Sequence, residues 1–255
     1  MWKWVQALDG VLRGEATRPS RLRDGQVPVP LGGLAVLCVL LGAVYGLCMG
    51  VFAVVSRDEP QYMQVLASMV KVPALFLLTL LVTLPSLYVF NALAGSRLGG
   101  LAVLRLLVAS LSVTLAVLAS FGPIVAFFSL TTASYPFMLL LNVAVFAVAG
   151  GLGLGFLLQT MHRLTLPERL SPPPIPASVA ADEPWGALEP TSGVPSRNVR
   201  AVFACWVIVF GLVGAQMSWV LRPFVGAPDR PFEWLRPRES NFFEAIRRTL
   251  SALFQ

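Results

Sequence analysis

The sequence predicts an all-α fold, a polytopic α-helical membrane protein with about five transmembrane helices and amphipathic helices at both ends. Hydrophobic residues make up 56% of the 255 positions and charged residues only 13%, whereas an ordinary soluble domain has about 25% charged residues. The mean hydropathy is +0.74. Four long stretches contain no Lys, Arg, Asp or Glu, namely 25–56, 72–96, 106–162 and 201–221. Uncharged apolar blocks of this length are typical of membrane spans.

Residues 1–30 predict a cytoplasmic segment that is both amphipathic and basic. Its apolar side chains recur at helical spacing, at Trp4, Leu8, Val11 and Leu12. This spacing predicts either a helix in the headgroup region of the membrane or a helix packed on the rest of the protein. A cluster of arginines follows, of the kind that faces anionic cytoplasmic lipid: Arg18, Arg21 and Arg23.

Residues 31–161 predict four transmembrane helices. One crossing needs about 20 apolar residues, because a helix rises about 1.5 Å per residue and the hydrocarbon core is roughly 30 Å thick. The first span is Leu31–Val55, and the second is Val72–Ala94, which follows a half-polar run from Gln61. The 56 residues of 106–161 are too many for one helix and fit two, joined at 130–136.

The next two regions differ sharply in composition. Residues 162–200 contain eight prolines and predict a Pro-rich linker loop. Residues 201–221 carry no charge and lie between Arg200 and Arg222. A helix of this length would span about 31 Å, nearly the thickness of the hydrocarbon core, so it is the fifth predicted transmembrane helix.

Residues 222–255, the tail, predict an ordered segment rich in aromatic and basic residues. Asn241 with Glu244 three positions later is typical of a helix start, and an amphipathic helix is expected from there to Phe254. Its apolar stripe includes Phe242, Phe243, Ile246 and Leu250. Because such a stripe is unfavourable in water, we expect these side chains to attach the tail to the membrane surface or to a partner protein.

The distribution of Lys and Arg favours a cytoplasmic N-terminus. Positive charges near span ends favour the cytoplasmic side. The N-terminal segment with the second and fourth loops holds eleven of them, against two in the first and third loops. Five spans then place the tail in the periplasm, in a protein of the bacterial inner (plasma) membrane. The six arginines of the tail oppose this assignment, but early helices usually dominate orientation.

Residue types that carry catalysis or bind metals are scarce. His162 is the only histidine, and Cys38, Cys48 and Cys205 lack the spacing of a metal or redox motif. All 13 acidic residues lie outside the predicted spans, which disfavours an ion-coupled transporter. We therefore expect no catalytic residue, no enzyme activity, no cofactor, no metal and no nucleic acid partner.

The predicted spans carry small residues and isolated polar groups instead. Two Gly-xxx-Gly patterns predict close helix packing. They consist of Gly42, Gly46 and Gly50 in the first span, and Gly151 and Gly155 in the fourth. Polar groups around Asn91 and Asn142 either line a small polar pocket or only connect helices by hydrogen bonds. Lys71 and Arg105 lie near span ends, where a long side chain reaches the interface.

The order of these segments carries a resemblance. Five spans after an amphipathic cytoplasmic segment are similar in outline to the Yip family of membrane proteins, although the loop signature of that family is absent. The tail sequence from Arg236 to Ala245 resembles uncharacterised bacterial five-span integral membrane proteins. These resemblances imply a polytopic membrane protein and no particular activity.

Two functions remain open at this level. The missing catalytic groups, the glycine faces and the aromatic tail favour a non-enzymatic accessory or scaffold subunit, which positions other membrane-protein subunits at the bacterial inner membrane. The polar groups around Asn91 and Asn142 favour instead a small-solute or lipid transporter (permease) without intramembrane carboxylates. In both cases the lipid bilayer is the immediate partner.

Overall fold

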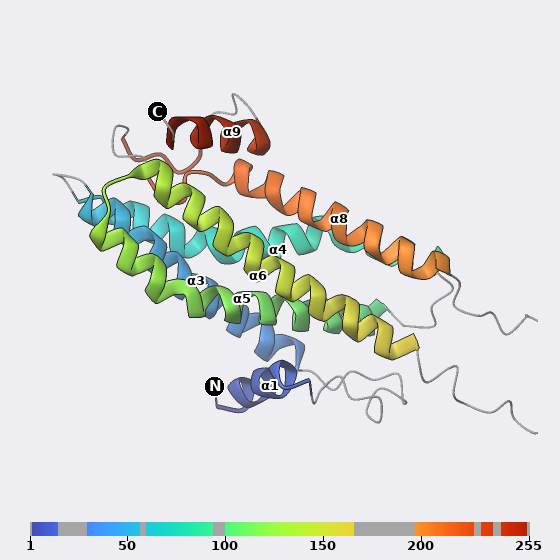
Figure 1. Ribbon diagram of the computed structural model, residues 1–255. Coiled ribbons are helices and arrows are strands. Elements are labelled where there is room, and N and C mark those ends of the chain that lie inside the picture. Colours follow the sequence, from blue (N-terminus) through green and yellow to red (C-terminus); the bar gives the residue numbers. More distant parts are fainter. Residues whose placement is uncertain are drawn as a thin grey trace, which may run out of the picture.

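The structure is a computed structural model, and it confirms the predicted all-α fold. It describes residues 2–14, 30–56, 60–93, 100–165, 197–226, 231–236 and 241–253. These residues contain seven helices and no strand: α1 (Trp2–Leu12), α3 (Leu31–Val55), α4 (Tyr62–Leu93), α5 (Gly100–Thr131), α6 (Tyr135–Thr165), α8 (Arg197–Val220) and α9 (Phe242–Leu253). The five long helices lie side by side in a bundle, and the short α1 and α9 pack on its outside (Figure 1).

The number of long apolar helices agrees with about five membrane spans. Within α3, α4, α5 and α6, four segments are long and apolar enough to cross a membrane: Leu31–Val55, Tyr62–Val89, Val103–Thr131 and Tyr135–Thr160. The 24-residue α8 includes a shorter apolar stretch, Cys205–Val220, and packs against α4 as the fifth helix of the bundle. The predicted second span is part of a longer helix, since α4 continues through Pro73 and Pro85.

Helices α3 and α4 approach each other closely along the predicted glycine face of α3. A Cβ atom at Gly50 would lie 2.8 Å from Val65 Cα, and one at Gly46 would overlap the Ser68 carbonyl oxygen. Gly42 makes a similar close approach to α4. Because the backbones themselves meet here, any side chain on this face would have to push the two helices apart. The structure thus places Gly42, Gly46 and Gly50 inside the molecule.

Helices α5 and α6 meet at a different glycine from the two predicted. The space for a Cβ at Gly153 is occupied by Thr114, and Ser110 Oγ donates a 2.7 Å hydrogen bond to the Gly153 carbonyl oxygen. Gly151 and Gly155 have no atom within 4 Å of their Cβ positions. Residues two positions apart on a helix point in roughly opposite directions, so these two glycines face away from the contact with α5.

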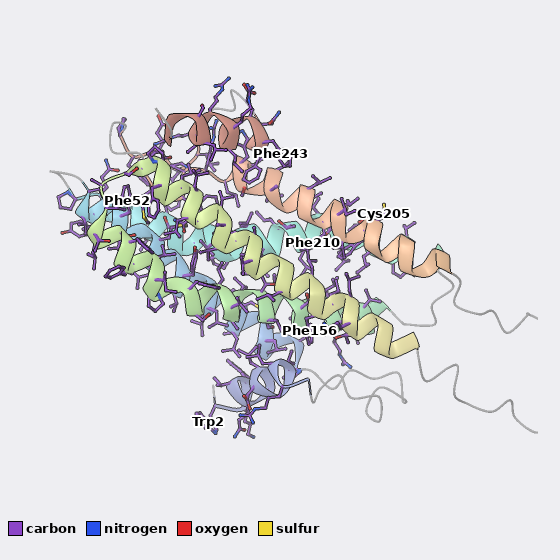
Figure 2. All side chains as sticks on the ribbon, in the orientation of Figure 1. Trp2, Phe52, Phe156, Cys205, Phe210 and Phe243 are labelled. Carbon is purple, nitrogen blue, oxygen red and sulfur yellow. The ribbon has the colours of Figure 1, made fainter. Side chains whose placement is uncertain are left out.

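Trp206 fixes α8 to α4. Its side chain is fully buried, and the indole Nε1 donates a 3.1 Å hydrogen bond to Ser86 Oγ. The ring of Phe210, one turn later, lies 5.3 Å from the Trp206 ring. Cys205 is exposed on the outer side of α8 (Figure 2). The amphipathic pattern of α8 therefore directs its aromatic side chains into the bundle.

Helix α1 packs on α3 and α5 through one face. Leu8 and Val11 are buried, and Trp4 covers Gly33, where a Cβ would lie 2.7 Å from the indole Nε1. Trp2 lies on the outer side of α1 and is 74% exposed (Figure 2). This packing favours the second of the two predicted arrangements, in which the helix rests on the rest of the protein.

The tail lies at the opposite end of the bundle from the start of α3 (Figure 1). Its helix α9 starts as predicted, because Asn241 Oδ1 accepts a 2.9 Å hydrogen bond from the Glu244 N–H. The Glu244 carboxylate forms an ion pair with Arg248 one turn later. Helix α9 then crosses the ends of α6 and α8 and contacts both.

Candidate functional site

A cavity of about 560 Å³ lies between α4, α6 and α8, at the end of the bundle where the tail folds back. Each of the three helices contributes a phenylalanine to its wall: Phe76 of α4, Phe146 of α6 and Phe210 of α8. The tail borders the cavity with residues 222–225 and with four residues of α9: Phe242, Ala245, Ile246 and Thr249. The cavity is therefore walled by membrane helices and covered by the tail.

Small residues on α6 and α8 explain why the cavity is empty of side chains. They are Gly150, Gly151, Gly211, Gly214 and Ala215. A Cβ atom at Gly150, Gly151 or Gly211 would meet no atom within 4 Å. Protein interiors are normally close-packed, but here α8 packs mainly on α4 and contacts α6 only slightly. The volume between α6 and α8 is left unfilled as a result.

An aromatic cluster that includes Phe76 and Phe146 forms part of the cavity wall. The Phe146 ring stacks on Phe76, with 5.8 Å between ring centres, and meets Tyr45 edge-on at 5.5 Å. The Tyr45 hydroxyl donates a 2.7 Å hydrogen bond to Asn142 Oδ1, and Asn142 Nδ2 donates to the Met138 carbonyl oxygen at 2.8 Å. Asn142 borders the cavity, and its amide joins α3 to α6.

The tail end of the cavity carries two arginines. The Arg222 guanidinium carbon lies 3.5 Å from the centre of the Trp219 ring, which is a cation–π contact. Arg236 borders the same end. Its backbone N–H donates a 3.3 Å hydrogen bond to the Arg222 carbonyl oxygen, which joins the two parts of the tail. The cavity is thus apolar between the helices and positively charged at its tail end.

Residues 222–226, the docked segment, are bound to α4 through their carbonyl oxygens. Gln64 Nε2 donates hydrogen bonds to the carbonyl oxygens of Pro223, at 3.1 Å, and Phe224, at 2.9 Å. Ser68 Oγ also donates to the Phe224 carbonyl oxygen. Gln64 and Ser68 are fully buried. These bonds join the buried side chains of Gln64 and Ser68 to the docked segment.

The docked segment also covers Lys71. The Lys71 ammonium donates a 3.0 Å hydrogen bond to the Pro223 carbonyl oxygen, and the Trp234 ring centre lies 5.9 Å away. Lys71 is only 4% exposed, although a side chain that reaches the water interface was expected. The tail takes the place of water around this charge.

Helix α9 uses one side for the cavity and leaves the other side exposed. Phe242 and Ile246 are half-buried and border the cavity. Phe243 and Leu250 are 52% and 46% exposed. Two of the four predicted attachment residues therefore contact this chain itself, and the other two face outward.

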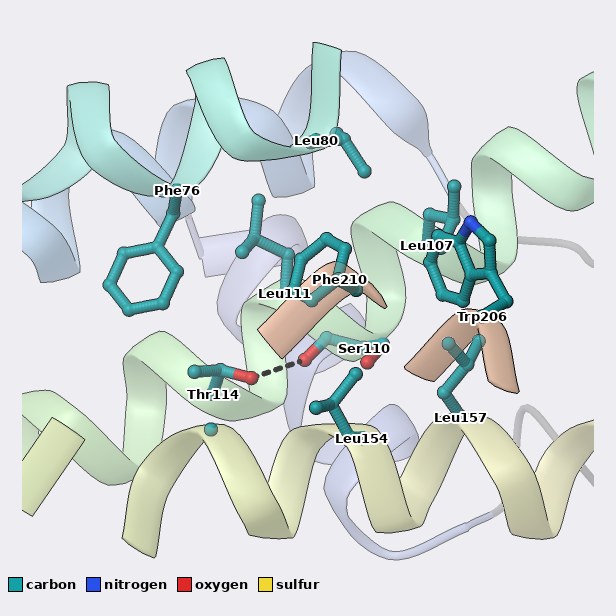
Figure 3. A pocket seen from close by; sticks show the side chains of 11 residues that line it. Phe76, Leu80, Leu107, Ser110, Leu111, Thr114, Leu154, Leu157, Trp206 and Phe210 are labelled. Carbon is teal, nitrogen blue, oxygen red and sulfur yellow. Dashed lines mark hydrogen bonds between the residues drawn. The ribbon is translucent and has the colours of Figure 1, made fainter. Parts of the chain in front are cut away.

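A second, smaller pocket of about 30 Å³ adjoins the cavity farther from the tail (Figure 3). Four residues border both spaces: Phe76, Gly150, Leu154 and Phe210. Side chains from α4, α5, α6 and α8 converge around the pocket, and the Thr114 hydroxyl donates a 3.1 Å hydrogen bond to the Ser110 carbonyl oxygen. The pocket extends the apolar part of the cavity toward Trp206.

The other residues that the sequence singled out do not form a second site within the described part of the chain. The side chains of Asn91 and His162 lie outside the part of the chain that the structure describes. Within that part, no group of three or more His, Cys, Asp or Glu residues could hold a metal ion. The sequence did not predict the cavity, since the small residues of α6 and α8 that create it are also typical of close helix contacts.

No family model, curated protein or solved structure matches the chain. The resemblance in outline to the Yip family stays a prediction.

Proposed function

We propose that this chain is a non-enzymatic integral membrane protein that takes a lipid from the bilayer into the cavity between α4, α6 and α8. The observation that carries the proposal is the cavity itself. Its volume of about 560 Å³ falls within the range of roughly 300–1,000 Å³ that is usual for ligand sites. Apolar walls with a few polar groups at one end suit a ligand that has a hydrocarbon part and a headgroup.

The shape of the cavity favours a lipid over a compact solute. Along α8 its bordering residues run from Phe210 to Trp219, which is roughly 14 Å of helix. Along α6 they run from Tyr135 to Leu154, roughly 28 Å. A cavity of about 560 Å³ that extends along this length of α6 is long and narrow. An extended acyl chain fits that space better than a rounded solute does.

A lateral route from the bilayer supports the same proposal. Gly151 of α6 and Gly211 of α8 border the cavity and are exposed. Neither residue has a side chain that would close the gap between the two helices. An acyl chain could pass between α6 and α8 without leaving the apolar phase.

Filling the cavity from one wall tests the proposal. Gly151→Phe should place a ring in the open space and reduce the amount of lipid that co-purifies with the protein several-fold. The fold should tolerate the change, because a Cβ at Gly151 meets no atom within 4 Å. The measurement is the lipid-to-protein ratio by native mass spectrometry in a mild detergent, with lipid extraction as a second readout.

The matched control is Gly155→Phe, on the same helix. A Cβ at Gly155 also has open space around it, but Gly155 does not border the cavity. The control should keep the lipid content of the wild type. Equal lipid content in all three proteins, or no bound lipid in any of them, would contradict the proposal.

An accessory or scaffold role is the second candidate function. It is favoured by a set of exposed apolar side chains on the tail, namely Trp234, Leu235, Phe243 and Leu250, which are 46–59% exposed. Such side chains at the end of a membrane bundle suit contact with lipid headgroups or with another subunit. A protein that remains bound in fixed stoichiometry in the same mass spectra would favour this role.

We also propose an orientation, with the N-terminus in the cytoplasm and the tail in the periplasm of a bacterial cell. A reporter protein that is active only in the cytoplasm should be active when inserted near Pro174 and silent when inserted near Asp58. The physical reason is the excess of Lys and Arg in the N-terminal segment and in the second and fourth loops. Activity at Asp58 with silence at Pro174 would reverse the orientation.

A further inference from the structure

Three positive charges gather at the tail end of the cavity. Arg222 and Arg236 border it there. The Lys71 ammonium does not border the cavity but donates a hydrogen bond to the carbonyl oxygen of Pro223, the residue after Arg222. Arg236 and Lys71 are held by adjacent residues of the docked segment, because the Arg236 N–H donates to the Arg222 carbonyl oxygen and the Lys71 ammonium donates to the Pro223 carbonyl oxygen. Among the residues that the structure describes, no carboxylate forms an ion pair with Lys71 or Arg236.

The charges of Lys71 and Arg236 are unfavourable in such a place, because no described carboxylate pairs with either of them. Lys71 is 4% exposed and Arg236 is half-buried, so water can solvate them only in part. Near a membrane, the low dielectric constant of the hydrocarbon strengthens the repulsion between them. An anion at the tail end of the cavity would offset this repulsion.

We propose that the lipid bound in the cavity is a phospholipid with a net negative headgroup, held at the tail end by Arg222 and Arg236. Its acyl chain would lie along α6 and α8. This inference rests on the proposed lipid-binding function and adds the class of headgroup. A free inorganic anion or an uncharged lipid would use only one half of the cavity.

The local geometry suits phosphate recognition. Guanidinium groups bind phosphate oxygens through two parallel N–H donors. Trp219 stacks on the Arg222 guanidinium group and restricts the orientation of its plane. The hydrogen bond from the Arg236 N–H to the Arg222 carbonyl oxygen keeps the two residues side by side. Lys71 is a positioning residue, because it holds the Pro223 carbonyl next to Arg222.

Selectivity against zwitterionic lipids follows from the same charges. A phosphatidylcholine headgroup would bring its own quaternary ammonium group into a region that already holds Lys71, Arg222 and Arg236. Like charges brought together in a partly buried site oppose binding. A phosphatidylglycerol headgroup carries the phosphate without that second charge.

The test compares these two lipids, with identical acyl chains, for binding to the purified full chain by native mass spectrometry titration. Wild type should prefer phosphatidylglycerol by about tenfold or more, because the quaternary ammonium group of phosphatidylcholine is repelled by the positive charges of the site. Arg236→Gln should remove most of this preference, and Arg236→Lys, which keeps the charge, should retain part of it. Arg247→Gln is the matched control, because Arg247 is exposed on α9 and does not border the cavity.

The outcomes separate this inference from the function on which it rests. Equal binding of both lipids to wild type, or an unchanged preference in Arg236→Gln, would overturn the headgroup assignment and leave lipid binding intact. Displacement of phosphatidylglycerol by inorganic phosphate alone would show a free-anion site and would also overturn the assignment. Binding of neither lipid would contradict the proposed function itself.

Discussion

Gly46→Leu is expected to force α3 away from α4 and to destabilise the protein severely. A Cβ atom at this position would already overlap the Ser68 carbonyl oxygen and lie 2.8 Å from Met69 Cα. Overfilling a packed core costs about 1–3 kcal/mol, and here the obstacle is backbone, which cannot rotate aside. We expect a loss of about 3 kcal/mol or more. The measurement is the thermal unfolding midpoint in detergent, followed by tryptophan fluorescence.

Two further variants serve as a milder change at the same position and as a control. Gly46→Ala should show a smaller loss of the same kind, because its single methyl group meets the same atoms. Gly32→Leu, near the start of the same helix, should have almost no effect, since Gly32 is exposed and has no atom within 4 Å of its Cβ position. If Gly46→Leu unfolded at the temperature of the wild type, the close contact between α3 and α4 would be wrong.

Gln64→Leu is expected to loosen the docked segment from α4. The change removes both hydrogen bonds that Gln64 donates to the carbonyl oxygens of Pro223 and Phe224. Each hydrogen bond contributes about 0.5–1.5 kcal/mol to stability, so the loss of two should weaken the attachment measurably. Ser68 and Lys71 still donate one bond each to the segment, so the release should be incomplete. Trypsin should cut the tail about tenfold faster or more, as judged by mass spectrometry.

The control for this prediction is Gln159→Leu. Gln159 is exposed on α6, so the same chemical change there removes no buried hydrogen bond. Its tail should be cut at the wild-type rate. A Gln64→Leu protein with a tail as resistant as that of the control would mean that these bonds do not hold the docked segment.

The positions of the membrane helices could be predicted because charges mark their ends. The first predicted span, Leu31–Val55, coincides with α3, and the predicted junction at 130–136 contains the break between α5 and α6. The second span was predicted to begin at Val72, whereas α4 begins at Tyr62. The first turns of α4 are half-polar in the sequence, because they contain Gln64, Ser68 and Lys71. These three polar side chains are buried because they bond the distant docked segment, and no local pattern reveals that contact.

The cavity could not be predicted for a different reason. Glycines at 42, 46 and 50 let two backbones touch, whereas those at 150, 151 and 211 face an open space. The residue type is the same in both places, and the distance between helix axes decides the outcome. That distance depends on the packing of α8 on α4 through Trp206, which is a property of the whole bundle. The spacing of glycines in the sequence does not indicate the distance between the helix axes.

The attachment of the docked segment has a consequence for how the protein is made. Lys71 precedes Pro223 by 152 residues, an interval of roughly 8–30 s at a synthesis rate of about 5–20 residues per second. During this time α4 has been synthesised, but Pro223 and Phe224, whose carbonyl oxygens accept the hydrogen bonds of Gln64 and Lys71, have not. The nascent bundle is therefore incomplete at one end until the tail arrives.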